Sequence, residues 1–202
     1  YDDDSNRLFS DSSAYPSVNK SIEKFEARNI DNNYVATYFP DIIKQLPGNI
    51  GGTATLPASV AGLAALGHND SVSFPWFAPA GFNRGSLQDI VNTKIRLNAA
   101  DRDNLYEARI NPIAKFTTGD YVIFGQKTLQ KNKSALDRVN VRRMLLEVKR
   151  IVSDIANGLI FEQNTAATRQ RFIKLAKPKL ASIQGNQGID RFKIVMDASN
   201  NT

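Results

Sequence analysis

Cations without acidic neighbours are the residues of this chain whose types and spacing point most clearly to chemistry. Residues 166–185 contain no aspartate or glutamate. The candidate contact residues of this stretch are Arg169, Arg171, Lys174 and Lys177. Three further candidates precede them on a separate predicted helix: Arg142, Arg143 and Arg150. Guanidinium and ammonium groups bind carboxylates and phosphates, so these residues could contact an acidic protein surface or a nucleic acid. Helix faces that meet only solvent would have the same composition.

Nucleic-acid binding lacks the features that usually accompany such cations. Single-strand binders combine basic residues with aromatic side chains on which bases stack. Here the aromatic cluster lies apart from the cations, as Phe74, Trp76, Phe77 and Phe82. No recognised DNA- or RNA-binding motif occurs either. We therefore expect the aromatic residues to pack in the core or between domains, and the cations to meet protein or solvent.

Catalytic chemistry finds little support in the other polar residues. His68 is the only histidine, and its place at the end of a predicted helix favours a surface role. Asp101 and Asp103 are two positions apart and would point to different faces of a helix. Residues 125–128, Gly-Gln-Lys-Thr, follow a predicted strand, but a glutamine separates the glycine from the lysine, unlike a phosphate-binding loop. We predict no enzyme activity, no cofactor and no metal site.

The composition is that of a globular protein with an uneven charge distribution. The chain has 202 residues, of which 42% are hydrophobic, and no cysteine, which excludes disulfides and thiolate metal sites. No apolar run reaches the roughly 18 residues of a membrane helix, so we predict no membrane contact. The first 80 residues carry 5 Lys and Arg against 9 Asp and Glu, a net charge of −4, and the remainder, with 21 against 11, carries +10.

The elements that must position the cations centre on residues 119–161. Residues 121–124 are a short apolar run, typical of a strand buried on both faces. From Val141 apolar residues recur every three or four positions, which predicts a helix that ends at Asn157 and packs its apolar stripe against a sheet. The predicted strands are residues 21–25, 34–39, 121–124, 159–161 and 189–197. The predicted helices are residues 57–66, 86–91, 98–108, 141–157 and 166–185.

Local signals set the ends of several helices. Asn98 and Thr165 are predicted N-caps, and Pro178 is expected to kink or split the last helix. Alternating helices and strands predict the α/β class, with a mixed sheet flanked by helices in two packed subdomains. We place these subdomains at residues 1–81 and 82–202.

A set of motifs occurs in an order and at spacings that match one protein family. In the second half they are residues 100–106, 110–113, 119–128, 139–143, 161–164, 188–189 and 197–202. Upstream they are residues 33–40, 56–62 and 78–85. Together, over residues 33–202, they resemble the contractile tail sheath proteins of bacteriophages, with residues 82–202 similar to the C-terminal sheath domain. Residues 1–32 match no part of the family that we can place. Because the family's terminal arms, outer insertion domains and final strand have no counterpart, we interpret the chain as part of a longer protein.

The resemblance implies a structural protein, not an enzyme. Sheath subunits surround a rigid tube as stacked rings and shorten by rigid-body rotation when the baseplate triggers them. The implied partners are other copies of the sheath protein, the tail tube protein, the baseplate and the tail terminator, without nucleic acid or membrane. The implied location is the tail sheath of the virion, after assembly in the host cytoplasm. Arms of neighbouring subunits add strands to the C-terminal sheet in this family, so we expect an open sheet edge and a monomeric state for this chain.

Two alternatives stay open. A phage-derived bacteriocin or secretion device uses a sheath of the same kind, and the sequence separates it poorly from a phage tail. A basic α/β nucleic-acid-binding module is the alternative from a different class. Tight, sequence-dependent DNA binding at physiological salt would favour that module.

Overall fold

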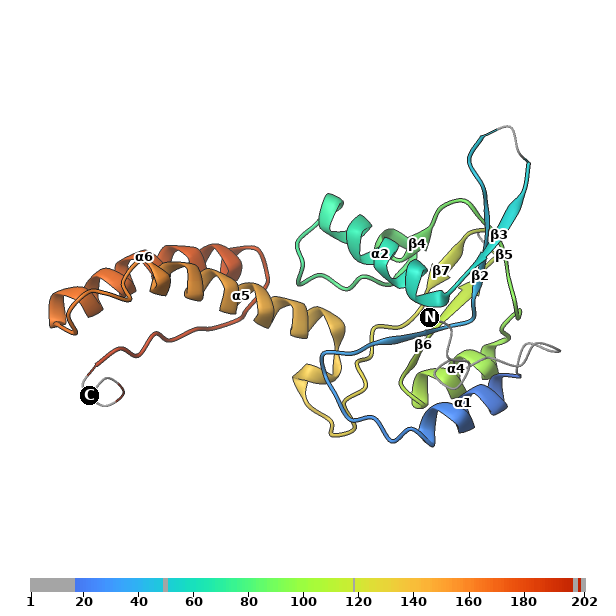
Figure 1. Ribbon diagram of the computed structural model, residues 1–202, viewed down its shortest axis with the longest axis horizontal. Helices are drawn as coiled ribbons and strands as arrows, with labels where there is room; N and C mark the ends of the chain where they lie inside the picture. The colour runs from blue at the N-terminus through green and yellow to red at the C-terminus, as the bar shows by residue number, and fades with distance from the viewer. Residues whose placement is uncertain (1–16, 49–50, 118, 198–199, 201–202) are drawn as a thin grey trace. The chain divides into compact units, whose positions relative to one another are not determined.

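The computed structural model describes residues 17–48, 51–117, 119–197 and 200, drawn in Figure 1. Its helices and strands confirm the predicted mixed α/β class. The chain forms two compact units, Tyr1–Arg142 (unit 1) and Arg143–Thr202 (unit 2). Strand pairs cross the boundary that we placed between residues 81 and 82, because segments before it pair with segments after it in both sheets.

The described residues of unit 1 form two small sheets. The first has the order β1 (Thr37–Phe39), β6 (Ile110–Lys115), β7 (Tyr121–Ile123) and β4 (Ser86–Leu87). Its β1 and β6 are parallel, and the other pairs are antiparallel. The second sheet has the order β3 (Thr53–Leu56), β2 (Ile42–Gln45) and β5 (Ile90–Thr93), all antiparallel. The predicted buried strand at residues 121–124 is confirmed over the three residues of β7, which are all buried, whereas Phe124 follows the strand and is 45% exposed.

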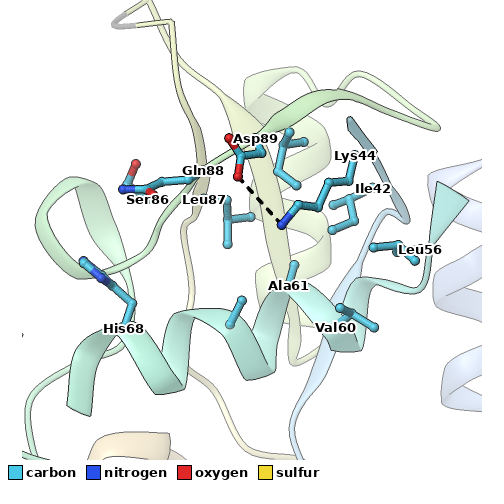
Figure 2. A pocket seen from close by; sticks show the side chains of 12 residues that line it. Ile42, Lys44, Leu56, Val60, Ala61, His68, Ser86, Leu87, Gln88 and Asp89 are labelled. Atoms are coloured by element: carbon cyan, nitrogen blue, oxygen red, sulfur yellow. Dashed lines mark ion pairs between the residues drawn. The ribbon is translucent and has the colours of Figure 1, made fainter. Parts of the chain in front are cut away.

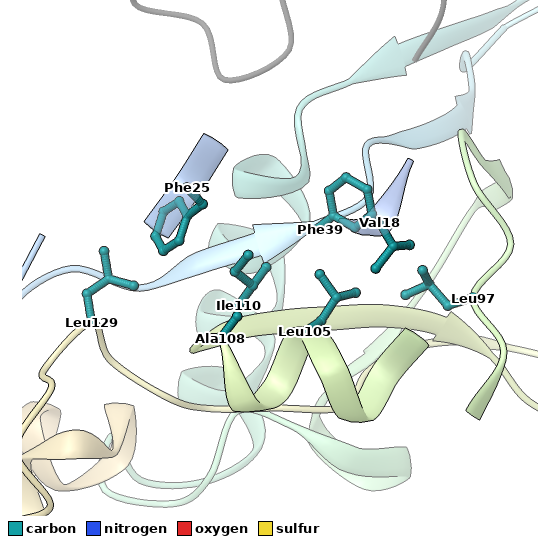
Figure 3. Packing of buried hydrophobic residues seen from close by; sticks show 8 residues of the cluster. All are labelled: Val18, Phe25, Phe39, Leu97, Leu105, Ala108, Ile110 and Leu129. Atoms are coloured by element: carbon teal, nitrogen blue, oxygen red, sulfur yellow. The ribbon is translucent and has the colours of Figure 1, made fainter. Parts of the chain in front are cut away.

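In the described part of unit 1, two clusters of buried hydrophobic residues lie on opposite faces of β6. Ile110 belongs to the cluster under α1 (Val18–Glu26) and α4 (Ala99–Glu107), where Figure 3 shows it beside Leu105 and Phe39. Ile113, three positions along the strand, belongs to the cluster that includes the small residues of α2 (Ala58–Val72). Side chains of a strand alternate between its faces, so an odd spacing sends these two isoleucines to different clusters. Burying each contributes about 1.5–3 kcal/mol.

Several helices begin at a residue whose polar side chain accepts a hydrogen bond from a backbone amide of the first turn. The predicted caps are confirmed, since Asn98 forms a capping box with Asp101 and the Thr165 hydroxyl accepts from the Thr168 amide. The first amide of α2 has no such neighbour. It donates instead to the carboxylate of Asp41, 17 residues earlier, at 3.0 Å.

Two predictions in the first half are wrong. Residues 21–25 are part of helix α1, because Val18, Ile22 and Phe25 recur at helical spacing and Ser17 caps the first turn. Residues 86–91 form β4 and β5 instead of a helix. Asp89 joins those strands with a left-handed φ of 62°, which aspartate tolerates better than most residues.

The predicted helix at residues 57–66 is longer than expected. Helix α2 continues through Gly67 to Val72, and the buried side chain of Asn69 donates to the Phe74 carbonyl at 3.1 Å beyond its end. This bond holds the last turn against the aromatic segment. Helix α3 (Gly81–Arg84) then leads into β4.

Unit 2 differs most from expectation. Residues 143–197 contain no strand, so the predicted strands at 159–161 and 189–197 are wrong for this chain. The apolar stripe of α5 (Val139–Asn157) is half-buried rather than packed on a sheet, although the helix ends at Asn157 as predicted. Helix α6 (Ala166–Gly185) runs through Pro178 without a break. The two helices run in opposite directions in Figure 1.

Candidate functional site

Helix α6 presents a row of cations on its exposed side. Its buried residues are Ala176, Leu180 and Ile183. The exposed cations Arg171, Lys174 and Lys177 are three positions apart, so they follow one another along the opposite side of the helix. We call these three residues the basic row. Arg169, also on α6, is half-buried and is not part of this row.

Little negative charge compensates the basic row. The only ion pair of the row among the described residues joins Arg171 to Glu162 at 3.8 Å, and the Arg171 side chain is 64% exposed. Exposed pairs of this kind contribute at most about 1 kcal/mol. Lys174 and Lys177 have no ion-pair partner in the described part of the chain. The row can therefore bind carboxylates or phosphates without first breaking strong internal pairs.

The upstream candidates on α5 are in different environments. Arg150 pairs with Glu147 at 2.6 Å and with Asp154 at 3.2 Å, one helical turn away on each side. The hydrogen bond from Arg150 lowers the pKa of the Glu147 carboxyl below its ordinary value of 4.5. Arg143 is half-buried. The charge of Arg150 is thus largely balanced within its own helix.

Arg142 lies in the interior of unit 1. It is 7% exposed, donates to the side-chain oxygen of Asn33, and its guanidinium carbon lies 4.1 Å from the centre of the Tyr34 ring. These contacts fix the start of α5 to a segment more than 100 residues earlier. Because Arg142 is enclosed by its own chain, it does not contribute to the exposed basic surface. The sequence held no local signal for this burial.

A pocket of about 270 Å³ lies between α2 and the second sheet. Lys44 and Asp89 form an ion pair, with 3.9 Å between Nζ and Oδ2, and Figure 2 shows His68 apart from that pair. Leu87 and Ala61 line the floor. His68 is half-buried within α2, not at its end. Ser86 and Asp89 also line the pocket, but no hydrogen bond among the described residues joins the His68 imidazole to either of them, so they do not form the chain of contacts of a hydrolytic triad.

Metal and membrane sites also find no support in the described residues. No group of three or more His, Cys, Asp or Glu side chains there could hold a metal ion. Asp101 is used in the capping box of α4. Among the described helices, none combines the length and the apolar character that crossing a bilayer requires.

Comparison with known proteins connects this geometry to one family. No family model matches the chain. The tail sheath protein of Vibrio phage KVP40 is 37% identical over 174 residues, which is 85% of this chain, and that of Enterobacteria phage T4 is 34% identical over 86% of it. Over most of its length, this chain is a homologue of the phage tail sheath proteins. The recognised resemblance to this family is thereby confirmed.

The homologous region is a limited part of those relatives. This chain spans about a quarter of the two curated sheath proteins, 24% and 25% of their lengths. The sheath of an extracellular contractile injection system, called PVC and solved in its contracted state, has a TM-score of 0.73 at 22% identity, covering 90% of this chain and 49% of the other. At that identity the match shows a shared sheath fold.

Proposed function

We propose that this chain is part of a subunit of a contractile phage tail sheath, which polymerises around the tail tube and contracts to drive the tube through the host envelope. Homology to tail sheath proteins and the shared sheath fold support this function. The chain would act mechanically, without catalysis. Its place would be the tail of the virion, after assembly in the host cytoplasm.

The basic row on α6 is the proposed contact with the tail tube or with the next subunit. The observation that carries this assignment is the exposure of the row, in which only Arg171 has an ion pair among the described residues, with Glu162 at 3.8 Å. Exposed ion pairs of moderate strength can form and break as a sheath changes state, because no charge is left buried without a partner. Arg143, Arg150 and Arg169 would contribute at the margin, since each is half-buried or already paired.

Other copies of the sheath protein, the baseplate and the tail terminator complete the proposed partners. A sheath of a phage-derived bacteriocin or secretion device is the second candidate, favoured by the similarity to the PVC sheath. Electron microscopy of complete particles separates the two, since only a phage carries a DNA-filled head.

Charge reversal tests the basic row. In the full-length protein, Lys174→Glu with Lys177→Glu should abolish or strongly reduce sheaths formed around tubes, counted by electron microscopy. The matched control, Lys149→Glu with Arg96→Glu, makes the same change in net charge at exposed positions outside α6. Normal sheaths from the α6 variant would rule out the row as the contact. Failure of both variants would point to a general effect of net charge.

A further inference from the structure

A second group of cations lies in unit 1, around the end of α4. It lines a cavity of about 630 Å³. The cations are Arg109, Lys127, Lys131, Lys133 and Arg138, and the acidic lining residues are Glu107 and Asp137. They come from the end of α4, from the segment after β7 and from the residue after the 3-10 helix η2 (Ala135–Asp137). Five cations against two carboxylates leave this cavity, which we call the Tyr106 cleft, with an excess of positive charge.

Tyr106 holds two of these cations in place. The ammonium of Lys127 donates to the Tyr106 carbonyl at 2.8 Å and lies 3.9 Å from the centre of the ring. The guanidinium of Arg138 donates to the Tyr106 hydroxyl and pairs with Asp137 at 3.2 Å. Carbonyl, ring and hydroxyl groups orient a cation without neutralising it. The charge of Lys127 therefore remains available to a ligand in the cleft.

Arg109 adds an independent observation, because its backbone is strained. It follows the C-cap of α4 with φ of 64°, in the left-handed region where glycine or asparagine usually ends a helix. A side chain at such a position costs stability. Its guanidinium has no hydrogen-bond or ion-pair partner among the described residues. Arg109 thus adds an unpaired cation to the lining of the cleft, at a position where glycine would be less strained.

We propose that the Tyr106 cleft binds a carboxylate-rich peptide segment of a neighbouring copy of this protein. Carboxylates pair with arginine through two parallel hydrogen bonds, which suits the unpaired guanidinium of Arg109. The sequence itself supplies such a segment, since residues 1–12 contain four aspartates and one arginine. A nucleic-acid base fits less well, because Lys127 already covers the Tyr106 ring on which it would stack. This inference rests on the proposed function for the presence of neighbouring copies.

A peptide titration tests the cleft without requiring sheath assembly. A fluorescein-labelled peptide with the sequence of residues 1–12 is added to the 202-residue chain at physiological salt, and binding is followed by fluorescence anisotropy. We expect saturable binding that weakens at least tenfold when the four aspartates are replaced by asparagine. Arg109→Gly should weaken binding about three- to tenfold and at the same time raise the melting temperature, because the backbone strain is relieved.

Gln187→Gly is the matched control. Gln187 follows the C-cap of α6 with φ of 63°, so the change should raise the melting temperature without affecting binding. Equal binding of the asparagine peptide, or unchanged binding by Arg109→Gly, would overturn the proposal. Tighter binding of a 12-nucleotide DNA strand would identify phosphate as the ligand and overturn it as well. The Lys174→Glu, Lys177→Glu variant should bind the peptide normally, which separates this cleft from the basic row.

Discussion

Gly62 shows how one residue sets the distance between a helix and a strand. A β-carbon at this position would lie 2.5 Å from a ring carbon of Tyr38, which is the middle residue of β1. Gly67 lies in the same helix, and a β-carbon there would meet nothing within 4 Å. A side chain added at Gly62 would thus clash with a neighbour, whereas one added at Gly67 would enter open space. The same substitution at Gly67 therefore serves as the control for Gly62.

We expect Gly62→Ala to lower the free energy of unfolding by about 1–3 kcal/mol, because the Tyr38 ring must move. Gly67→Ala should raise it by up to about 1 kcal/mol, since alanine favours the helix and adds no clash. Urea denaturation followed by circular dichroism measures both. A stabilising Gly62→Ala would show that the helix and strand can separate at little cost.

Individual residues were predictable where their signal is local. Asn98 and Thr165 cap helices that begin beside them, and the sequence alone indicated both. Arg142 was a candidate contact residue because it is a cation on a predicted helix, and guanidinium groups bind carboxylates and phosphates. Its burial depends on Asn33 and Tyr34, and only the tertiary fold brings that segment to α5.

At the scale of elements, helix α6 depends on a narrow buried face. Leu180 is buried, whereas Leu175 in the same helix is 46% exposed. Leu180→Ala should therefore destabilise α6 by about 2–4 kcal/mol, because it removes buried methyl groups and leaves a cavity. Leu175→Ala should change its stability by less than about 0.5 kcal/mol. Hydrogen exchange of the α6 amides measures both effects, and equal effects would contradict the observed packing.

Helices and strands with a clear run of apolar residues or a clear end signal in the sequence were predicted well. Strands that need another segment of the chain to pair with were not. Strand β7, the end of α5 and the extent of α6 agree with the sequence analysis. Residues 189–197 alternate in exposure as a strand would, with Phe192, Ile194 and Met196 half-buried. They are not a strand because no neighbouring segment in the described chain pairs with them. The alternation of apolar and polar side chains predicts which face of a segment is apolar. A β-strand also requires a second segment with which its backbone can form hydrogen bonds.

At the scale of the whole molecule, the two units differ in how much core they contain. Of the buried hydrophobic residues that the structure describes, 20 lie in unit 1 and only Ala176, Leu180 and Ile183 lie in unit 2. We expect amides of α6 to exchange with solvent through openings of lower free energy than those of β6 and β7. Hydrogen exchange at increasing urea concentrations tests this difference. Identical opening free energies would mean that both units unfold together.

The parallel pairing of β1 with β6 has a consequence for how the protein reaches its native state. Thr37 pairs with Ile110, so everything between these residues must be made before the first sheet can close. Contacts between such distant residues slow folding, because closing the long loop between them costs conformational entropy before the strand pairing can stabilise the fold. Protein synthesis proceeds at roughly 5–20 residues per second, so β1 leaves the ribosome several seconds before β6 is made. During this interval its backbone hydrogen-bonding groups are available to chaperones or to other nascent chains.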